Sequence, residues 1–382
     1  GAFPVPAGLM LVPADADLGA VTALAAGRLP DAWPGSLEAH RRAFAGDLAG
    51  ALEELPRDDP VGRYNRWLID PDGDDADEVA RGLPASYRPL VDVVRYASGA
   101  GDTLPVADDD TNPVVAALIT ATRATVLLEA GDAEGAAELV EQAATSVADV
   151  PVLHAVLIAN AGSILHEHDL DPERARSHLT GAATALAETD LTLHRAEIHY
   201  ALGQIEHERA ARGGAPLQGA MHHYYTAVQL IDETTAPELW ASTQMSLAAA
   251  HLSSPMTLAS DGLRAGVAVQ ALRAALQVFT RERYPAQWAA ASLNLANALV
   301  YAPSVKQGDN LVEAVELYEE VLEVRDRDTD PIGRARTLTN LGNALAHLGI
   351  FDHAKARLVE ARYLFDEQLD SDGVMTVRVL LD

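Results

Sequence analysis

The sequence predicts an all-α protein built from consecutive helical hairpins. Hydrophobic residues make up 48% of the 382 residues, but aromatic residues only 5%, and much of the apolar content is alanine and leucine. That composition favours helices, because strands are typically richer in β-branched and aromatic residues. In addition, three segments of the C-terminal half repeat one proline-led pattern, and an amphipathic segment follows each of them.

The three proline-led segments align with one another. They are PELWASTQMSLAAAH from Pro237, PAQWAAASLNLANAL from Pro285 and PIGRARTLTNLGNAL from Pro331. Each has alanine four residues after the proline and leucine six residues after that alanine. Proline is well tolerated in the first turn of a helix, where its missing N–H would have no partner anyway. Each segment is therefore predicted to be the first helix, helix A, of a hairpin.

The second helix, helix B, is predicted from the segments that follow. These are VAVQALRAALQVF from Val267, LVEAVELYEEVLEV from Leu311 and HAKARLVEARYLF from His353. In the middle segment apolar residues recur at helical spacing, with glutamates opposite. The loop between the helices is short in the last hairpin, at Gly349, and longer in the two before, around 253–262 and 302–309.

The same alternation continues upstream with a weaker pattern. Three further helix pairs are predicted, and they bring the total to six hairpins between about 113 and 370. The helices of these pairs cover about 113–130 and the segment after Gly131, 151–168 and 172–188, and 190–211 and 216–232.

Residues before 112 are less regular. A hairpin is predicted from Leu37, with its turn at Gly46, and a polar stretch from Gly101 separates this part from the repeats. Residues Asp110 to Asn112 lie where they could cap the helix that follows Pro113. We therefore predict an irregular helical region over 1–112, a repeat array over 113–372, and a C-terminal tail or cap over 373–382.

The motifs NLANAL at Asn294 and NLGNAL at Asn340 resemble helix A of a tetratricopeptide repeat (TPR), in which a small residue follows leucine. Ala314 and Ala354 match the small positions of helix B. The long repeats are similar to a variety found in large bacterial multidomain proteins, often joined to caspase-like CHAT peptidase domains or to signalling modules. The resemblance is most specific over 237–370.

The resemblance implies a right-handed α-solenoid whose concave groove is lined mainly by A helices. Asparagine side chains in such a groove can hydrogen-bond the backbone of an extended peptide, although they could equally tie neighbouring helices together. The positions of this chain that the resemblance places in the groove are Met245, Leu293, Asn297, Tyr301, Arg336, Thr339, Asn343 and His347.

The charge balance narrows the range of partners. There are 56 acidic and 28 basic side chains, which gives a formal net charge of −28. This field repels nucleic acids and anionic membranes and favours a basic protein or peptide, although it could serve solubility alone. No segment approaches the roughly 20 apolar residues of a membrane span. The absence of cysteine fits a reducing cytoplasm.

Histidines cluster in one region. Nine of the 13 lie between His154 and His223, so a metal- or small-ligand-binding function, in a maturation factor or an enzyme, is the alternative hypothesis. No HExxH motif or nucleotide-binding loop occurs, which favours a protein without catalytic activity or cofactor. Interhelical hydrogen bonds and surface exposure would also explain these histidines. The candidate ligands are His166, His168, His199 and His207.

The sequence thus favours a bacterial, cytoplasmic scaffold or adaptor that binds protein. A third hypothesis is a sensor in which residues 1–112 cover the groove until a ligand arrives.

Overall fold

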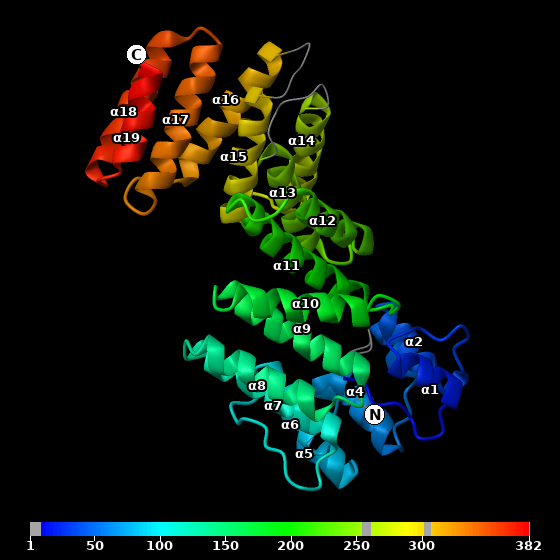
Figure 1. Ribbon diagram of the computed structural model, residues 1–382. Helices are drawn as coiled ribbons and strands as arrows, with labels where there is room; N and C mark the ends of the chain where they lie inside the picture. Colours follow the sequence, from blue (N-terminus) through cyan, green and yellow to red (C-terminus); the bar gives the residue numbers. More distant parts are fainter. Residues whose placement is uncertain (1–8, 254–260, 302–306, 382) are drawn as a thin grey trace. The chain divides into compact units, whose positions relative to one another are not determined.

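The computed structural model describes residues 9–253, 261–301 and 307–381, and over these ranges the secondary structure is helical, with no strand (Figure 1). The chain divides into two compact units, Gly1–Ile205 and Glu206–Asp382. The division falls within α11 (Thr192–Ala211). The boundaries predicted at 112 and 372 concern the repeat pattern and stay predictions.

The first part of unit 1 consists of short helices joined by 3-10 turns, as expected for its irregular sequence. The hairpin predicted from Leu37 is present, and its turn at Gly46 has φ of +81°, a conformation that favours glycine. The elements are α1 (Leu18–Ala25), η1 (Gly35–Leu37), α2 (Glu38–Phe44), α3 (Leu48–Glu54), α4 (Pro60–Ile69), η2 (Pro71–Gly73), α5 (Ala76–Gly82), η3 (Ala85–Tyr87) and α6 (Pro89–Ala97).

Longer hairpins follow in unit 1 and confirm the first two of the three helix pairs predicted from the weaker repeats. The first begins after Asn112, whose side chain accepts a hydrogen bond from the backbone N–H of Val114 and so caps the helix. Its partner begins after the turn at Gly131, where φ is +82°. The helices are α7 (Pro113–Glu129), α8 (Ala133–Ser146), α9 (Pro151–Glu167) and α10 (Pro172–Ala185).

Unit 2 carries the most regular repeats. Its three A helices begin at Pro237, Pro285 and Pro331, as predicted. The three B helices begin earlier than the predicted segments, α14 at Asp261, α16 at Gln307 and α18 at Phe351. Most of the longer loops expected before α14 and α16 lies outside the described residues. The helices are α12 (Gln218–Leu230), α13 (Pro237–Ser253), α14 (Asp261–Val278), α15 (Pro285–Tyr301), α16 (Gln307–Val324), α17 (Pro331–His347), α18 (Phe351–Glu367) and α19 (Ser371–Leu381).

The order of helix packing in unit 2 is that of stacked hairpins. Each helix from α12 to α19 packs against the next one in sequence. The A helices also touch one another, α13 with α15 and α15 with α17, and α17 touches the last helix, α19. In unit 1, α7 to α10 pack in the same sequential way. The predicted fold class, an α-solenoid of TPR-like hairpins preceded by a less regular helical part, is confirmed.

Small residues set the distance between the two helices of a hairpin. A methyl group added at Gly342 of α17 would lie 2.7 Å from the Leu358 side chain and 3.2 Å from the Ala354 carbonyl oxygen, both on α18. A methyl group added at Gly162 of α9 would meet the corresponding pair on α10, the Leu179 side chain at 3.0 Å and the Ala175 carbonyl oxygen at 3.2 Å. A glycine in the middle of the first helix of each of these hairpins therefore lets the two backbones approach, and the same contact recurs in both units.

This contact predicts the effect of enlarging Gly342. Gly342→Ala is expected to lower the free energy of unfolding by about 1–3 kcal/mol, because the added methyl group overlaps the buried Leu358. Gly266→Ala is the matched control, since Gly266 lies within α14 with nothing near its added methyl group, and it should stabilise the protein by about 0.5–1 kcal/mol. Urea unfolding followed by circular dichroism measures both changes. Equal effects of the two substitutions would contradict the packing argument.

Candidate protein-binding face

The predicted groove residues lie on three A helices that touch one another in sequence order. Met245 is on α13, Leu293, Asn297 and Tyr301 are on α15, and Arg336, Thr339, Asn343 and His347 are on α17. Their surroundings separate them into residues that build the helix stack and residues that face solvent.

Three of these positions contribute to packing. Met245 and Leu293 are half-buried and pack on the main apolar core of unit 2. Thr339 is 8% exposed, and its hydroxyl donates to the Ala335 carbonyl oxygen one turn earlier in α17. These three side chains lie mainly beneath the surface of the face and leave little area for contact with a partner.

Asn297 joins three helices. Its Oδ1 accepts a hydrogen bond of 2.7 Å from the Tyr318 hydroxyl of α16 and another of 2.9 Å from Nδ2 of Asn340 on α17. Tyr318 is buried, and burial raises the pKa of its phenol, so this hydroxyl remains a donor at neutral pH. The oxygen that could have received a peptide N–H is therefore occupied by two donors of the protein itself.

The remaining positions are accessible. Tyr301 is 59% exposed, and its hydroxyl accepts a hydrogen bond of 3.3 Å from Nδ2 of Asn343. Arg336 and His347 are exposed on the same helix as Asn343. An aromatic ring, an amide and a guanidinium on adjacent A helices are groups that commonly anchor a bound peptide.

A cavity of about 360 Å³ lies where α17 meets α18 and α19. It includes two residues predicted from the sequence, Arg336 and Thr339. The sequence analysis did not predict the other lining residues. One signal could have found part of them, because aspartate is a common helix cap and Asp370 precedes α19. In the structure the Asp370 side chain accepts a hydrogen bond of 2.9 Å from the Gly373 N–H and so caps this helix. These other lining residues are Asn340, Phe365, Asp370, Asp372, Gly373 and Thr376.

The charges in this cavity are mixed. Asp370 and Asp372 supply carboxylates, and Arg336 supplies a guanidinium that forms no ion pair within the described ranges. Such a cavity suits a ligand that has both hydrogen-bond donors and acceptors. A peptide backbone is one example, and a basic side chain next to a carboxylate is another.

The histidine-rich region uses several of its histidines between helices. Nδ1 of His154 on α9 lies 2.9 Å from the Ala144 carbonyl oxygen of α8, and Nε2 of His178 on α10 lies 2.6 Å from Oε1 of Glu141 on α8. In the part of the chain that the structure describes, no three histidine, aspartate or glutamate side chains gather as metal ligands. Of the four candidates, His166 and His168 lie at the end of α9, and His199 and His207 lie eight residues apart on α11.

Glu141 also binds Arg174 of α10, at 2.9 and 2.8 Å. Burial alone would raise the pKa of Glu141, but the hydrogen bonds from Arg174 and His178 outweigh it and hold the pKa below the ordinary 4.5. Glu141 thus joins two hairpins, through an ion pair with Arg174 and a hydrogen-bonding contact with His178.

No helix among the described residues has the length and apolar character to cross a membrane.

Neither a known family model nor a curated protein matches the sequence. Among solved structures, this chain is similar to a Signal Transduction ATPase with Numerous Domains (STAND) protein with a tetratricopeptide repeat sensor from Pyrococcus horikoshii, at 16% identity and a TM-score of 0.52, over 90% of this chain and 48% of that one. It is also similar to BtubC (BKLC) from P. vanneervenii (19% identity, TM-score 0.47, 61% of this chain and 90% of that one). A third similar structure is the apo form of RapI (10% identity, TM-score 0.47, 89% of this chain and 92% of that one).

These likenesses concern the fold. The chain spans about half the length of the STAND protein, so the similarity covers one part of that molecule. In its fold, the chain is therefore a TPR-like helical-repeat protein.

The contacts of Asn297 predict that it stabilises the stack. Asn297→Ala is expected to lower the free energy of unfolding by about 1–3 kcal/mol, because it leaves the buried Tyr318 hydroxyl and the Asn340 amide without an acceptor. Asn343 is half-buried but bonds only weakly, at 3.3 Å, to the exposed Tyr301 hydroxyl, so Asn343→Ala leaves no buried group without a partner and should change the free energy of unfolding by less than about 0.5 kcal/mol. Urea unfolding compares the two variants, and a loss for Asn343→Ala as large as that for Asn297→Ala would contradict this assignment.

The Glu141 network predicts a dependence of stability on pH. Because the folded-state pKa of Glu141 is lowered, its contribution is present above the ordinary carboxyl pKa of 4.5 and is lost as the pH falls below it. Glu141→Gln should therefore destabilise the protein at pH 7 by about 1 kcal/mol, a value limited by partial solvent exposure. Thermal unfolding from pH 7 to pH 3 should show the difference from wild type shrinking, whereas Glu138→Gln, an exposed change on the same helix, should show little difference at any pH.

Proposed function

We propose that the protein is an interaction scaffold or adaptor, which binds a peptide or partner domain along the face formed by α13, α15 and α17. The observation that carries this proposal is the cavity at one end of the face, because Arg336 and Thr339, both predicted as groove residues, line it together. Asn343 lies on the same helix, α17, and its amide donates a hydrogen bond to the exposed Tyr301 of α15. Binding sites of repeat proteins typically extend over such successive repeats.

The fold supports a role in recognition. In the STAND protein of similar fold, the repeats are described as a sensor. We propose a binding role for the present chain as well, in the cytoplasm of a bacterium and without an enzymatic reaction of its own. Asn297, Met245 and Leu293 would act indirectly, by keeping the A helices in position, while Arg336, Asn343, Tyr301 and His347 would contact the partner.

The charges favour a basic partner. The chain has a formal net charge of −28, and Asp370 and Asp372 add carboxylates to the cavity itself. A lysine or arginine of the partner would pair with these carboxylates, while Arg336 would receive a backbone carbonyl or a carboxylate. Nucleic acids and anionic membranes are disfavoured by the same field. The metal-binding alternative gains no support from the described histidines, which form no group of three ligands.

Peptide selection followed by affinity measurement tests the proposal. Peptides selected on the full chain from a random displayed library should be enriched in lysine and arginine. The best of them, measured by fluorescence anisotropy, should lose at least about tenfold in affinity for Arg336→Ala/Asn343→Ala, which corresponds to two polar contacts. The affinity should also fall with added salt.

The matched control is Lys355→Ala/Arg362→Ala. Both residues are exposed on α18, and one basic charge more is removed than in the test variant. This variant should bind the selected peptide at least as well as wild type. If the selected peptides bind the Arg336→Ala/Asn343→Ala variant with the same affinity as wild type, the binding face lies elsewhere.

A further inference from the structure

Unit 1 contains a second cavity, remote in sequence from the repeats of unit 2. It has a volume of about 510 Å³, which is within the range of small-molecule sites. Its wall comes from the segment before α1, from η1 and α2, from the end of α3, and from α4 with the residue that precedes it. The polar lining residues are Asp15, Ser36, His40, Glu54, Asp59 and Asn65.

His40 is a buried lining residue with an unused hydrogen-bonding atom. Its side chain is 2% exposed, and its Nε2 lies 3.1 Å from the Leu11 carbonyl oxygen. Because a carbonyl oxygen only accepts, Nε2 carries the hydrogen and donates it. Burial lowers the pKa of His40, so the ring is neutral at pH 7 and Nδ1 is an acceptor. No described residue donates to this Nδ1. Buried acceptors without a partner are costly, which points to a donor supplied from outside the chain.

The wall beside His40 is rigid. Asn65, also fully buried, accepts a hydrogen bond from the Leu11 N–H at 2.7 Å and donates one to the Leu11 carbonyl oxygen at 2.8 Å. The same carbonyl oxygen therefore receives both His40 and Asn65. Since their positions are held by the same backbone group, the cavity is formed before any ligand arrives.

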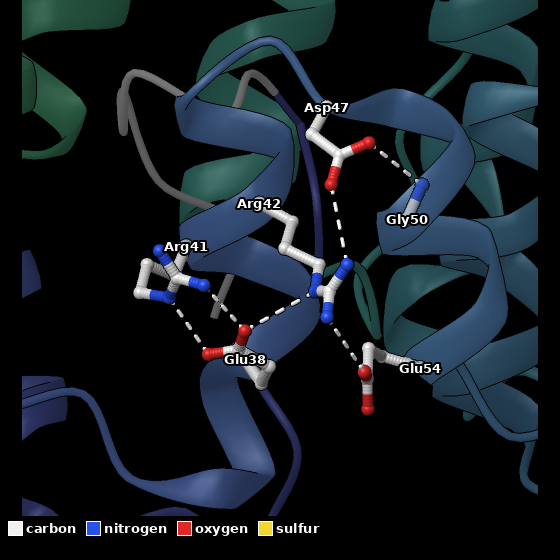
Figure 2. A network of polar contacts seen from close by, with 6 residues as sticks. All are labelled: Glu38, Arg41, Arg42, Asp47, Gly50 and Glu54. Atoms are coloured by element: carbon white, nitrogen blue, oxygen red, sulfur yellow. Dashed lines mark hydrogen bonds and ion pairs between the residues drawn. The ribbon is translucent and has the colours of Figure 1, made fainter.

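A network of ion pairs holds one carboxylate of the cavity (Figure 2). Arg42 reaches from α2 to Glu54 on α3 at 3.3 Å, and it also pairs with Glu38 and Asp47. Hydrogen bonds from Arg41 and then from Arg42 lower the pKa of Glu38 to about 2, so that this carboxylate stays ionised. Arg42 is thus shared among three carboxylates and does not neutralise the cavity.

The other two carboxylates have no cationic partner. Asp59 accepts from the Gly62 N–H at the start of α4, at 2.7 Å, and Asp15 forms no hydrogen bond or ion pair with its side chain among the residues described. Among the described residues that line the cavity, none is a lysine or an arginine. The cavity therefore offers acceptors almost exclusively: three carboxylates, the Nδ1 of His40 and the Ser36 hydroxyl.

We propose that this cavity binds an organic cation that carries a guanidinium or primary ammonium group, with His40 Nδ1 and the carboxylates of Asp15 and Asp59 as acceptors. A guanidinium presents donors in a plane and has no acceptor, which complements a wall made of acceptors. The cation comes either from a free small molecule or from an arginine or lysine side chain of a partner. The proposal is independent of the binding face in unit 2.

Calorimetric titration of the full chain tests the proposal with a matched pair of probes. 1-Butylguanidine should bind, and 1-butylurea, of the same shape but neutral, should bind at least about tenfold more weakly, because it keeps the size and loses the charge. Asp15→Asn/Asp59→Asn should lower the affinity for 1-butylguanidine by at least about fivefold, because two charge pairs near the surface are lost. Asparagine at 59 still offers an oxygen to the Gly62 N–H, so α4 keeps its cap.

The control variant is Asp102→Asn/Asp109→Asn, which removes the same charge from an exposed segment away from the cavity. It should bind 1-butylguanidine like wild type, and circular dichroism should show equal helix content in all variants. Nitrogen-15 NMR of histidine-labelled protein adds a direct readout, because a donor at His40 Nδ1 should shift that resonance upon binding. Equal binding of the two probes, no binding by calorimetry, or an unmoved Nδ1 resonance would each overturn the proposal.

A third probe distinguishes the two sources of the cation. N-acetyl-arginine amide carries the same guanidinium within peptide-like bonds. If it binds as tightly as 1-butylguanidine, the cavity receives an arginine side chain of a protein; if only 1-butylguanidine binds, the cation is a free small molecule.

Discussion

The close approach of helix A to helix B is the constraint on which the repeats depend. At Gly342 and Gly162 a single added methyl group would meet a leucine and a backbone carbonyl oxygen of the partner helix at 3.2 Å or less. Close-packed interiors leave no room for such a group. With this distance set, the buried residues one turn apart on helix B, such as Ala354 and Leu358, reach the core, and the next hairpin can stack on the first.

Stacking then decides which polar residues remain available for binding. Asn297 and Asn343 occupy equivalent places in their motifs, NLANAL and NLGNAL. In the structure Asn297 is held between Tyr318 and Asn340, whereas Asn343 reaches only the exposed Tyr301. Both side chains are half-buried, but Asn297 is bound by two donors from neighbouring helices and serves stability, whereas the partner of Asn343 is itself exposed. One motif position thus has two physical roles, because the last repeat has a different neighbour.

The acidic character of the chain has local consequences as well as a global one. Ion pairs link hairpins, as Glu141 of α8 does with Arg174 of α10. Around α2, one arginine is shared among three carboxylates, so acidic groups outnumber their counterions. Such arrangements leave carboxylates beside cavities in both units, and this is the physical basis for expecting cationic groups in the partners of this protein.

By itself, the sequence determined the helix pairs, the prolines that start three A helices, the small residues at the contact between helices, and the negative field. These are local or additive properties: helix periodicity, the missing N–H of proline, side-chain volume and summed charge. Only the tertiary structure decided that Asn297 is occupied by its neighbours, that α19 forms the cavity with Arg336, and that His40 and Asn65 share the Leu11 carbonyl oxygen. Those relations join residues 21 to 54 positions apart, and no local pattern encodes which side chains meet after the helices have packed.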